Sequence, residues 1–216
     1  MRPGGPPPWA ALSAAERVID LAALPERLAA MGELEVIDGP VPVASPRQSA
    51  VLAPLYVGEQ GPAVVLTRRA AHLRNHHGEV SFPGGRQEDH DVDLAATALR
   101  EAHEEIRLEP NTVEVVGRLD RLSTFVSQSM IHPFVGVLPG HPAELVADPG
   151  EVEHILHVSL ADLLDPEAFH EEFWRFPDGQ DRGLVFFEIE GDTIWGATAR
   201  MLRQLLNVAL GLDPRA

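Results

Sequence analysis

Residues 84–108, GGRQEDHDVDLAATALREAHEEIRL, decide the fold of this chain, because a Gly-Gly turn leads there into a long helical pattern. Nothing from Asp93 to Arg107 breaks a helix. The apolar residues of the segment recur at steps of three and four: Leu94, Ala95, Ala98, Leu99, Ala102 and Ile106. We therefore predict a helix over residues 93–107 that packs one apolar stripe against the core.

The opposite face of this helix is acidic. Glu101 and Glu105 are four residues apart and Glu104 is three from Glu101, so their side chains lie on adjacent turns. Arg100 and Arg107 are too few to neutralise them, and a bound divalent cation is the natural counter-charge for such a cluster. The alternative is an ordinary solvated helix face that carries three glutamates.

The segment resembles the Nudix box, whose pattern is G-x5-E-x7-R-E-U-x-E-E-x-G-U with U an aliphatic residue. Gly85 matches the first glycine. The R-E-x-x-E-E core is matched by Arg100, Glu101, Glu104 and Glu105. The resemblance implies an α/β fold, the Nudix α/β/α sandwich with a mixed β-sheet between helices, and hydrolysis of a diphosphate bond.

The box departs from the pattern at two places. Fourteen residues instead of thirteen separate Gly85 from Arg100, so Asp91 or Glu88 would stand in for the first glutamate. Arg107 occupies the position of the final glycine, which predicts a helix end that does not need a left-handed glycine cap. Neither departure touches the core glutamates.

The upstream residues 65–85, VLTRRAAHLRNHHGEVSFPGG, carry a narrower resemblance, to the coenzyme A pyrophosphatase subfamily. The subfamily pattern is L-L-T-x-R-S-x3-R-x3-G-x-V-x-F-P-G-G. Its positions are met by Leu66, Thr67, Arg69, Arg74, Gly78, Val80, Phe82, Pro83, Gly84 and Gly85, with Val65 and Ala70 as replacements. The stretch IWGATARML at residues 194–202 is similar to the closing strand-to-helix segment of the same subfamily.

A basic segment precedes the glycine turn. Arg68, Arg69 and Arg74 offer guanidinium groups suited to phosphate, and we expect them to bind substrate. Arg68 taken alone also fits a solvated loop. His76 and His77 lack a third partner at ligand spacing and do not form a transition-metal motif.

The resemblance also implies a division of roles in the site. Glu101, Glu105 and Glu104 would hold Mg²⁺ or Mn²⁺, the hard cations that carboxylates prefer. Gly84 or Gly85 would approach the metal closely, and Arg100 would orient a metal glutamate. The general base stays open between three residues: Glu104, Glu88 and Glu151.

Two kinds of function remain to be compared. The subfamily resemblance implies hydrolysis of coenzyme A, free, acylated or oxidised, to 3′,5′-ADP and 4′-phosphopantetheine. The box alone equally suits ADP-ribose, dinucleotides or nucleoside triphosphates. A non-enzymatic binding module normally lacks the metal glutamates, and all three core glutamates are present here.

Composition limits the remaining choices. With 216 residues and 44% hydrophobic content the chain can bury a full core. A net charge of −16 argues against non-specific nucleic-acid binding, and the absence of cysteine excludes thiol nucleophiles and disulfides. No signal peptide or membrane-length apolar run is evident, so we expect a cytoplasmic protein, monomeric or homodimeric, that acts on a small molecule.

Punctuation by proline and glycine predicts the remaining elements. We expect residues 1–46 to form a flexible segment and a helix near 14–31 that packs on the domain, and residues 47–216 to form the Nudix hydrolase domain. Strands are expected at 49–57, 63–68, 113–122, 130–138 and 154–159, with a further apolar run at 183–189. Helices are expected at 160–164 and 197–210. Leu202, Leu205, Leu206 and Ala209 of the last helix should pack in the core.

Overall fold

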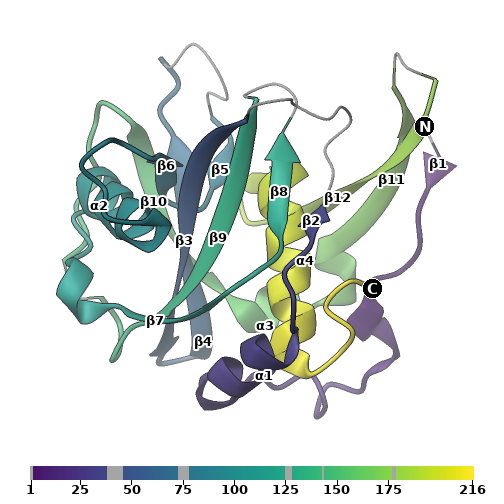
Figure 1. Ribbon diagram of the computed structural model, residues 1–216. Coiled ribbons are helices and arrows are strands. Elements are labelled where there is room, and N and C mark those ends of the chain that lie inside the picture. Colours follow the sequence, from purple (N-terminus) through teal and green to yellow (C-terminus); the bar gives the residue numbers. More distant parts are fainter. Residues whose placement is uncertain (1, 38–45, 73–77, 125–127, 143, 177–178) are drawn as a thin grey trace.

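The computed structural model describes residues 2–37, 46–72, 78–124, 128–142, 144–176 and 179–216. Within these ranges nine strands form one large mixed sheet, the central layer in Figure 1. Its main path runs β10 (Val152–Ser159), β4 (Gly61–Arg69), β3 (Arg47–Gly58), β9 (Ser129–Val137), β8 (Arg121–Thr124) and β2 (Val36–Ile37). The short strands β5 (Val80–Ser81), β6 (Gly84–Arg86) and β7 (Glu114–Arg118) join β4, β3 and β9 respectively. The sheet is mixed because β3 pairs with β9, and β2 with β8, in parallel.

A smaller antiparallel sheet stands beside the large one. It contains β1 (Arg2–Pro3), β11 (Phe169–Arg175), β12 (Asp181–Ile189) and β13 (Asp192–Trp195). The N-terminal segment is anchored here, because the fully buried Trp9 packs its ring against Phe169 and Phe187.

Helices cover both faces of the large sheet. The helix α2 (Leu94–Ile106) packs on β3, β6 and the adjoining apolar cluster, whereas α4 (Gly196–Leu210) lies on the other side, toward the smaller sheet. The short helices α1 (Leu24–Ala30) and α3 (Leu160–Leu163) complete the layers. The expected α/β sandwich with a mixed sheet between helices is thus confirmed. No helix in the described ranges is long and apolar enough to cross a lipid bilayer.

The helix α2 forms as its periodicity predicts. Asp93 caps it by accepting a hydrogen bond from the Ala96 backbone N–H at 2.8 Å. Ala98, Ala102 and Ile106 are fully buried. The helix does end in a left-handed cap, but an arginine takes the place of the glycine: Arg107 adopts φ 56° and closes the helix.

The expected helix near residues 14–31 is also wrong over most of its length. A helix exists only at Leu24–Ala30, after a 3-10 turn at Leu21–Ala23. Two local turns take the place of a continuous helix. Ser13 donates hydrogen bonds to the Glu16 carboxylate, and the Asp20 carboxylate accepts one from the Ala22 backbone N–H. The Ala and Leu content of residues 14–31 therefore predicted a longer helix than the one that forms.

Most other elements are confirmed within a few residues. The single strand expected at 113–122 is instead two strands, β7 and β8, separated by Leu119 and Asp120, whose side chains are buried. Asp120 accepts hydrogen bonds from Gln204 and Arg215, and this polar network explains the break. Leu202, Leu205, Leu206 and Ala209 of α4 are fully buried, as predicted. The strand β11 was not predicted, and β13 was expected only as the strand part of the closing segment at residues 194–202.

Candidate active site

The glycine turn and the acidic helix meet at Glu101. Its carboxylate lies directly over the α-carbon of Gly85, where a β-carbon would be 2.5 Å from the carboxylate carbon. Gly84 has φ 155° and lies against the backbone of Ala50, so a side chain is excluded there too. Gly85 therefore allows the turn to approach the helix closely, and Gly84 allows it to approach β3.

Glu105 is the most deeply buried carboxylate of the site, with a side chain 4% exposed. Arg69 at the end of β4 lies 3.8 Å away, measured from Nη1 to Glu105 Oε1. The other oxygen, Oε2, is buried and has no hydrogen-bond partner within the described residues. Burial raises the pKa of Glu105 to about 8, although Arg69 lowers it and nearby carboxylates raise it further. The single arginine therefore does not offset the cost of burying the charged form of Glu105.

Arg100 is held by acidic partners on three sides. Its Nε and Nη2 donate to the two oxygens of Asp91 at 2.9 and 3.0 Å, and its Nη1 reaches Glu104 at 2.8 Å and Glu101 at 3.0 Å. The Arg100 hydrogen bonds hold the pKa of Asp91 well below its usual range. Asp91, and not Glu88, is thus the residue of the inserted segment that contacts Arg100.

The candidate bases differ in position. Glu88 is exposed and pairs with His90 at 3.5 Å, and Glu104 is more than half exposed and bound to Arg100. Glu151 is exposed beside the site, where its backbone oxygen accepts a hydrogen bond from Ala70 N–H at 2.8 Å. The charge of Glu151 raises the pKa of both Glu101 and Glu105, after the larger effect of burial. Glu151 is therefore near enough to Glu101 and Glu105 for its charge to act on both.

The acidic side chains do not form a complete metal cage. Within the described ranges, no three acidic or histidine side chains enclose a cation by themselves. Glu101 and Glu105 face the glycine turn, while Glu104 turns toward Arg100 and solvent. An open arrangement of this kind suits Mg²⁺, which is usually held by one or two carboxylates together with waters and substrate phosphates.

The two neighbouring arginines of β4 point to opposite sides of the sheet, as consecutive strand residues do. Arg69 faces Glu105 on α2. Arg68 instead binds the carboxylate of Asp192 and the backbone oxygen of Gly191 on the hairpin that leads into β13. Arg74, His76 and His77 lie outside the described residues.

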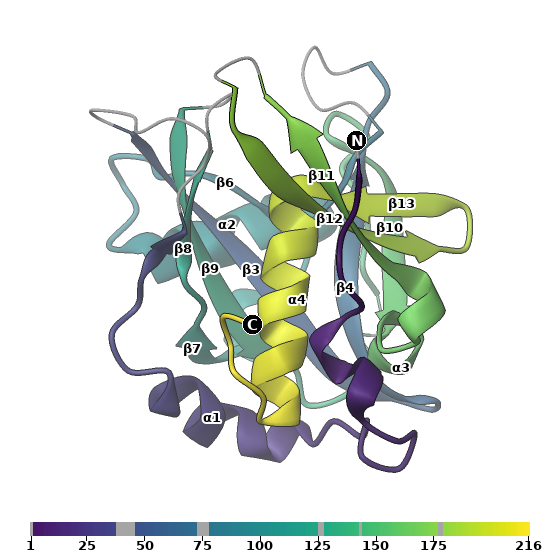
Figure 2. The same ribbon diagram turned by 90° about the vertical axis from the view of Figure 1, so that its right-hand side faces the viewer.

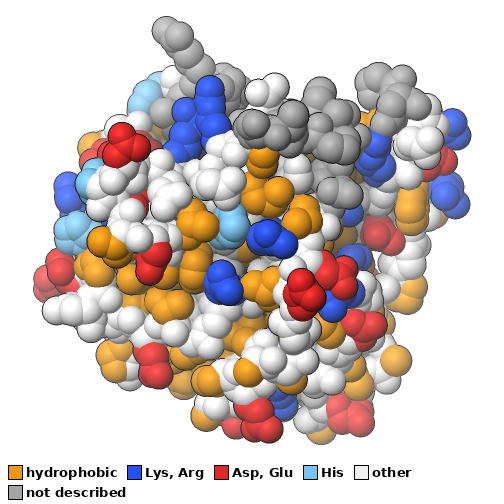
Figure 3. All heavy atoms as spheres, in the orientation of Figure 1, with side chains coloured by type: hydrophobic (Ala, Val, Ile, Leu, Met, Phe, Trp, Pro, Cys, Tyr) orange, Lys and Arg blue, Asp and Glu red, His pale blue; other side chains and the backbone are white. Residues whose placement is uncertain are grey.

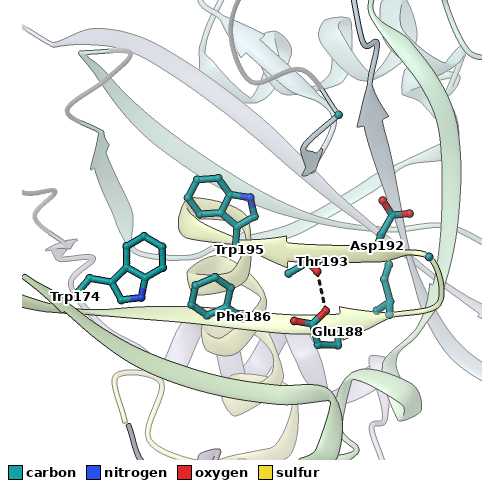
Figure 4. A pocket seen from close by; sticks show the side chains of 9 residues that line it. Trp174, Phe186, Glu188, Asp192, Thr193 and Trp195 are labelled. Atoms are coloured by element: carbon teal, nitrogen blue, oxygen red, sulfur yellow. Dashed lines mark hydrogen bonds between the residues drawn. The ribbon is translucent and has the colours of Figure 1, made fainter. Parts of the chain in front are cut away.

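A pocket of about 630 Å³ lies on the Arg68 side of the strand. Figure 4 shows three aromatic rings along it, from Trp174, Phe186 and Trp195, with Glu188 bonded to Thr193 further along. Both tryptophans are 43% exposed. The sequence did not reveal this pocket, because β11, which carries Trp174, was not recognised as a strand.

An acidic helix packed on a Gly-Gly turn, on one face of a mixed sheet that helices cover on both sides, is the arrangement typical of Nudix hydrolases. The chain belongs to the Nudix family, since the family model described as "NUDIX domain" matches residues 46–178.

Known proteins support this membership. The chain is 36% identical over 173 residues to "Uncharacterized Nudix hydrolase NudL" of Enterobacter sp. (strain 638), covering 80% of this chain and 87% of that protein. It is 40% identical over 179 residues to "Nudix hydrolase 22, chloroplastic" of Arabidopsis thaliana, covering 78% of this chain and 57% of that protein. The crystal structure of a NUDIX hydrolase from Alicyclobacillus acidocaldarius shares the fold, with a TM-score of 0.50, 19% identity, and coverage of 80% of this chain and 99% of that chain.

Proposed function

We propose that this Nudix hydrolase cleaves the diphosphate bond of coenzyme A to give 3′,5′-ADP and 4′-phosphopantetheine, with Mg²⁺ or Mn²⁺ as cofactor. The observation that carries the proposal is the position of Arg69. This residue occupies the arginine of the coenzyme A pyrophosphatase pattern, and its guanidinium is 3.8 Å from the buried Glu105. The arginine that we expect to bind phosphate therefore lies next to the carboxylates that would hold the metal ion.

The environment of Glu105 supports the proposed metal ion, because one arginine does not offset the cost of burying this carboxylate. Its Oε2 has no partner among the described residues, and burial raises its pKa to about 8. Glu101 and Glu105 would hold the cation, with Glu104 as a further ligand if it left Arg100. A bound divalent cation supplies Lewis-acid stabilisation of the diphosphate oxygens and lowers the pKa of the attacking water.

The protein's own residues would complete the chemistry. Arg69 would bind a phosphate oxygen of the substrate, and Gly85 would leave room for the Glu101 carboxylate between the turn and the helix. Arg100, fixed by Asp91, would keep Glu101 in position. Among the three candidate bases we favour Glu151, because its exposed carboxylate is electrostatically coupled to Glu101 and Glu105 and has no ion-pair partner among the described residues. Its carboxylate would accept the proton of the attacking water.

The test is a substrate panel with product identification. The protein is incubated with Mg²⁺ and coenzyme A, ADP-ribose, a dinucleotide or a nucleoside triphosphate, and the products are identified by mass. We expect coenzyme A to give 3′,5′-ADP and 4′-phosphopantetheine with the highest kcat/KM. Glu101→Gln should lower this rate by orders of magnitude even at saturating Mg²⁺, whereas Glu109→Gln, an exposed change beyond the same helix, should not. Cleavage of ADP-ribose with none of coenzyme A would overturn the substrate.

A further inference from the structure

Three cationic or potentially cationic side chains gather on the large sheet outside the site described above. They are Arg118 at the end of β7, Arg121 at the start of β8 and His132 on β9, and together we call them the cationic shelf. Figure 3 shows blue side chains and one pale-blue histidine over β8 and β9, in the middle of this face. The grouping is unusual in a chain with 17 basic and 33 acidic residues.

Strand register places the cationic shelf in line with the proposed metal site. Ala50 of β3 pairs with Gly85 on one side and with His132 on the other. The Leu122–Ile131 pair puts Arg121 opposite His132. Neighbouring strands are about 4.8 Å apart, so His132 is about 10 Å and Arg121 about 14 Å along this row from Gly85. Because Glu101 lies over Gly85, the row begins at the acidic helix.

Members of one such row project to the same face of a sheet. His132 lies within the electrostatic influence of both arginines. Burial lowers the pKa of His132 most, and the charges of Arg121 and Arg118 lower it further. Arg118 also lies over the ring of Phe134, 6.0 Å from its centroid, on the side of the sheet that α2 covers. The cationic shelf and the acidic helix therefore share one surface.

The arginines of the cationic shelf lack acidic partners. Neither Arg118 nor Arg121 forms an ion pair within the part of the chain that the structure describes. Arg121 donates from Nη2 to the Leu34 backbone oxygen at 3.3 Å, and its buried Nε has no partner there. The nearby acid Asp120 is bound to Arg215 instead. Two unpaired guanidinium groups on a strongly anionic protein favour an anionic ligand.

We propose that Arg118, Arg121 and His132 bind a second phosphate group, a phosphomonoester on the nucleotide half of the substrate whose diphosphate lies at Glu101 and Glu105. In coenzyme A this group is the 3′-phosphate of the ribose. The inference rests on the proposed function and makes it more specific, because ADP-ribose carries no such monoester. Arg121 would exchange its hydrogen bond to the Leu34 backbone oxygen for the phosphate, and Arg118 would approach from beside the row, where it pairs with Phe134 of β9.

The test compares coenzyme A with 3′-dephospho-coenzyme A in the wild type and in the double variant Arg118→Gln/Arg121→Gln. We expect the wild type to prefer coenzyme A by about tenfold or more in kcat/KM, the effect of a charged hydrogen bond. The double variant should lose this preference through a raised KM for coenzyme A alone. Arg175→Gln, which removes an exposed arginine on the smaller sheet, serves as the control for loss of positive charge away from the cationic shelf and should keep the preference. An unchanged ratio in the folded double variant would overturn the cationic shelf.

A binding measurement separates this inference from the proposed function. By calorimetry without metal, the wild type should bind 3′,5′-ADP about tenfold more tightly than 5′-AMP, and the double variant should bind both equally. If coenzyme A is not hydrolysed but this difference is found, the proposed substrate fails and the cationic shelf stands. If coenzyme A is hydrolysed and the wild type does not distinguish the two nucleotides, the cationic shelf fails alone.

Discussion

The guanidinium of Arg69 lies 3.8 Å from the carboxylate of Glu105 and joins the last residue of β4 to the acidic face of α2. This one arginine does not balance the site, because burial still raises the pKa of Glu105 to about 8. The metal-free protein therefore keeps a carboxyl group in a place where its charged form is unfavourable. Binding a cation would relieve that cost.

The first prediction concerns pH and stability without metal. Below about pH 4.5 Glu105 is protonated in both the folded and the unfolded protein, so its ionisation has no effect on the free energy of unfolding. Between about pH 4.5 and 8 the unfolded chain releases this proton while the folded chain keeps it, and the free energy of unfolding falls as pH rises. In EDTA, Glu105→Gln should therefore be more stable than the wild type at pH 8, and the difference should narrow toward pH 4.5. Urea denaturation across this range measures it; a difference that does not vary with pH would contradict the burial argument.

Mg²⁺ supplies the complementary measurement. A ligand that binds only the folded state raises its stability by mass action. At pH 8, millimolar Mg²⁺ should raise the melting temperature of the wild type and change that of Glu105→Gln much less. An equal shift in both proteins would remove Glu105 from the proposed ligands.

The second prediction tests the contact between the turn and the helix. In Gly85→Ala the new methyl group would lie 2.5 Å from the Glu101 carboxylate carbon and displace it. We expect kcat to fall at least tenfold while the fold survives, because a displacement of this size disturbs the position of a reacting group. Gly140→Ala has no atom within 4 Å of the added carbon and should retain full activity. Unchanged kinetics in Gly85→Ala would mean that Glu101 can move without consequence.

The third prediction uses the neighbouring arginines as a matched pair. Arg69→Gln should raise KM for coenzyme A about tenfold or more, because a charged contact to phosphate is lost. Arg68→Gln removes the same charge one residue earlier, but Arg68 is bound to Asp192 on the opposite side of the sheet. The KM of the Arg68→Gln variant for coenzyme A should change little. Equal effects of the two substitutions would indicate a general electrostatic attraction instead of a specific contact.

The fourth prediction addresses the end of α2. Arg107 holds a left-handed conformation at φ 56° that costs a residue with a side chain about 1 kcal/mol. Arg107→Gly should raise the free energy of unfolding by about this amount, and Arg107→Ala, which keeps the β-carbon, should not. Denaturant titration compares the three proteins, and activity should be the same in all of them. A Gly variant no more stable than the Ala variant would refute the strain.

Periodicity was enough to predict α2 and α4, because a buried apolar stripe repeats along one side of each helix. Periodicity carries no information on backbone angles, so the left-handed Arg107 was missed. The break between β7 and β8 depends on Asp120 meeting Gln204 and Arg215, residues distant in sequence. Local propensity alone could not reveal such a contact.

The candidate site was only partly accessible from sequence. The helical spacing indicated that Glu101 and Glu105 lie on one face, but the proximity of Glu151 depends on how β10 packs beside β4. The separation of Arg68 from Arg69 was available from strand alternation and was missed because this segment was treated as a basic loop. The cationic shelf required the register of four strands.

The identity of the cleaved bond tests the central claim most directly. Acetyl-coenzyme A is incubated with the protein and Mg²⁺ in ¹⁸O-water, and the products are analysed by mass spectrometry. Attack at the diphosphate predicts 3′,5′-ADP and acetylated 4′-phosphopantetheine. One of the two phosphate groups formed from the diphosphate should carry ¹⁸O, and no labelled acetate should appear. The site has metal-type carboxylates and no cysteine to form a thioester intermediate, so the acetyl group should remain attached. Free labelled acetate with intact coenzyme A would contradict this account.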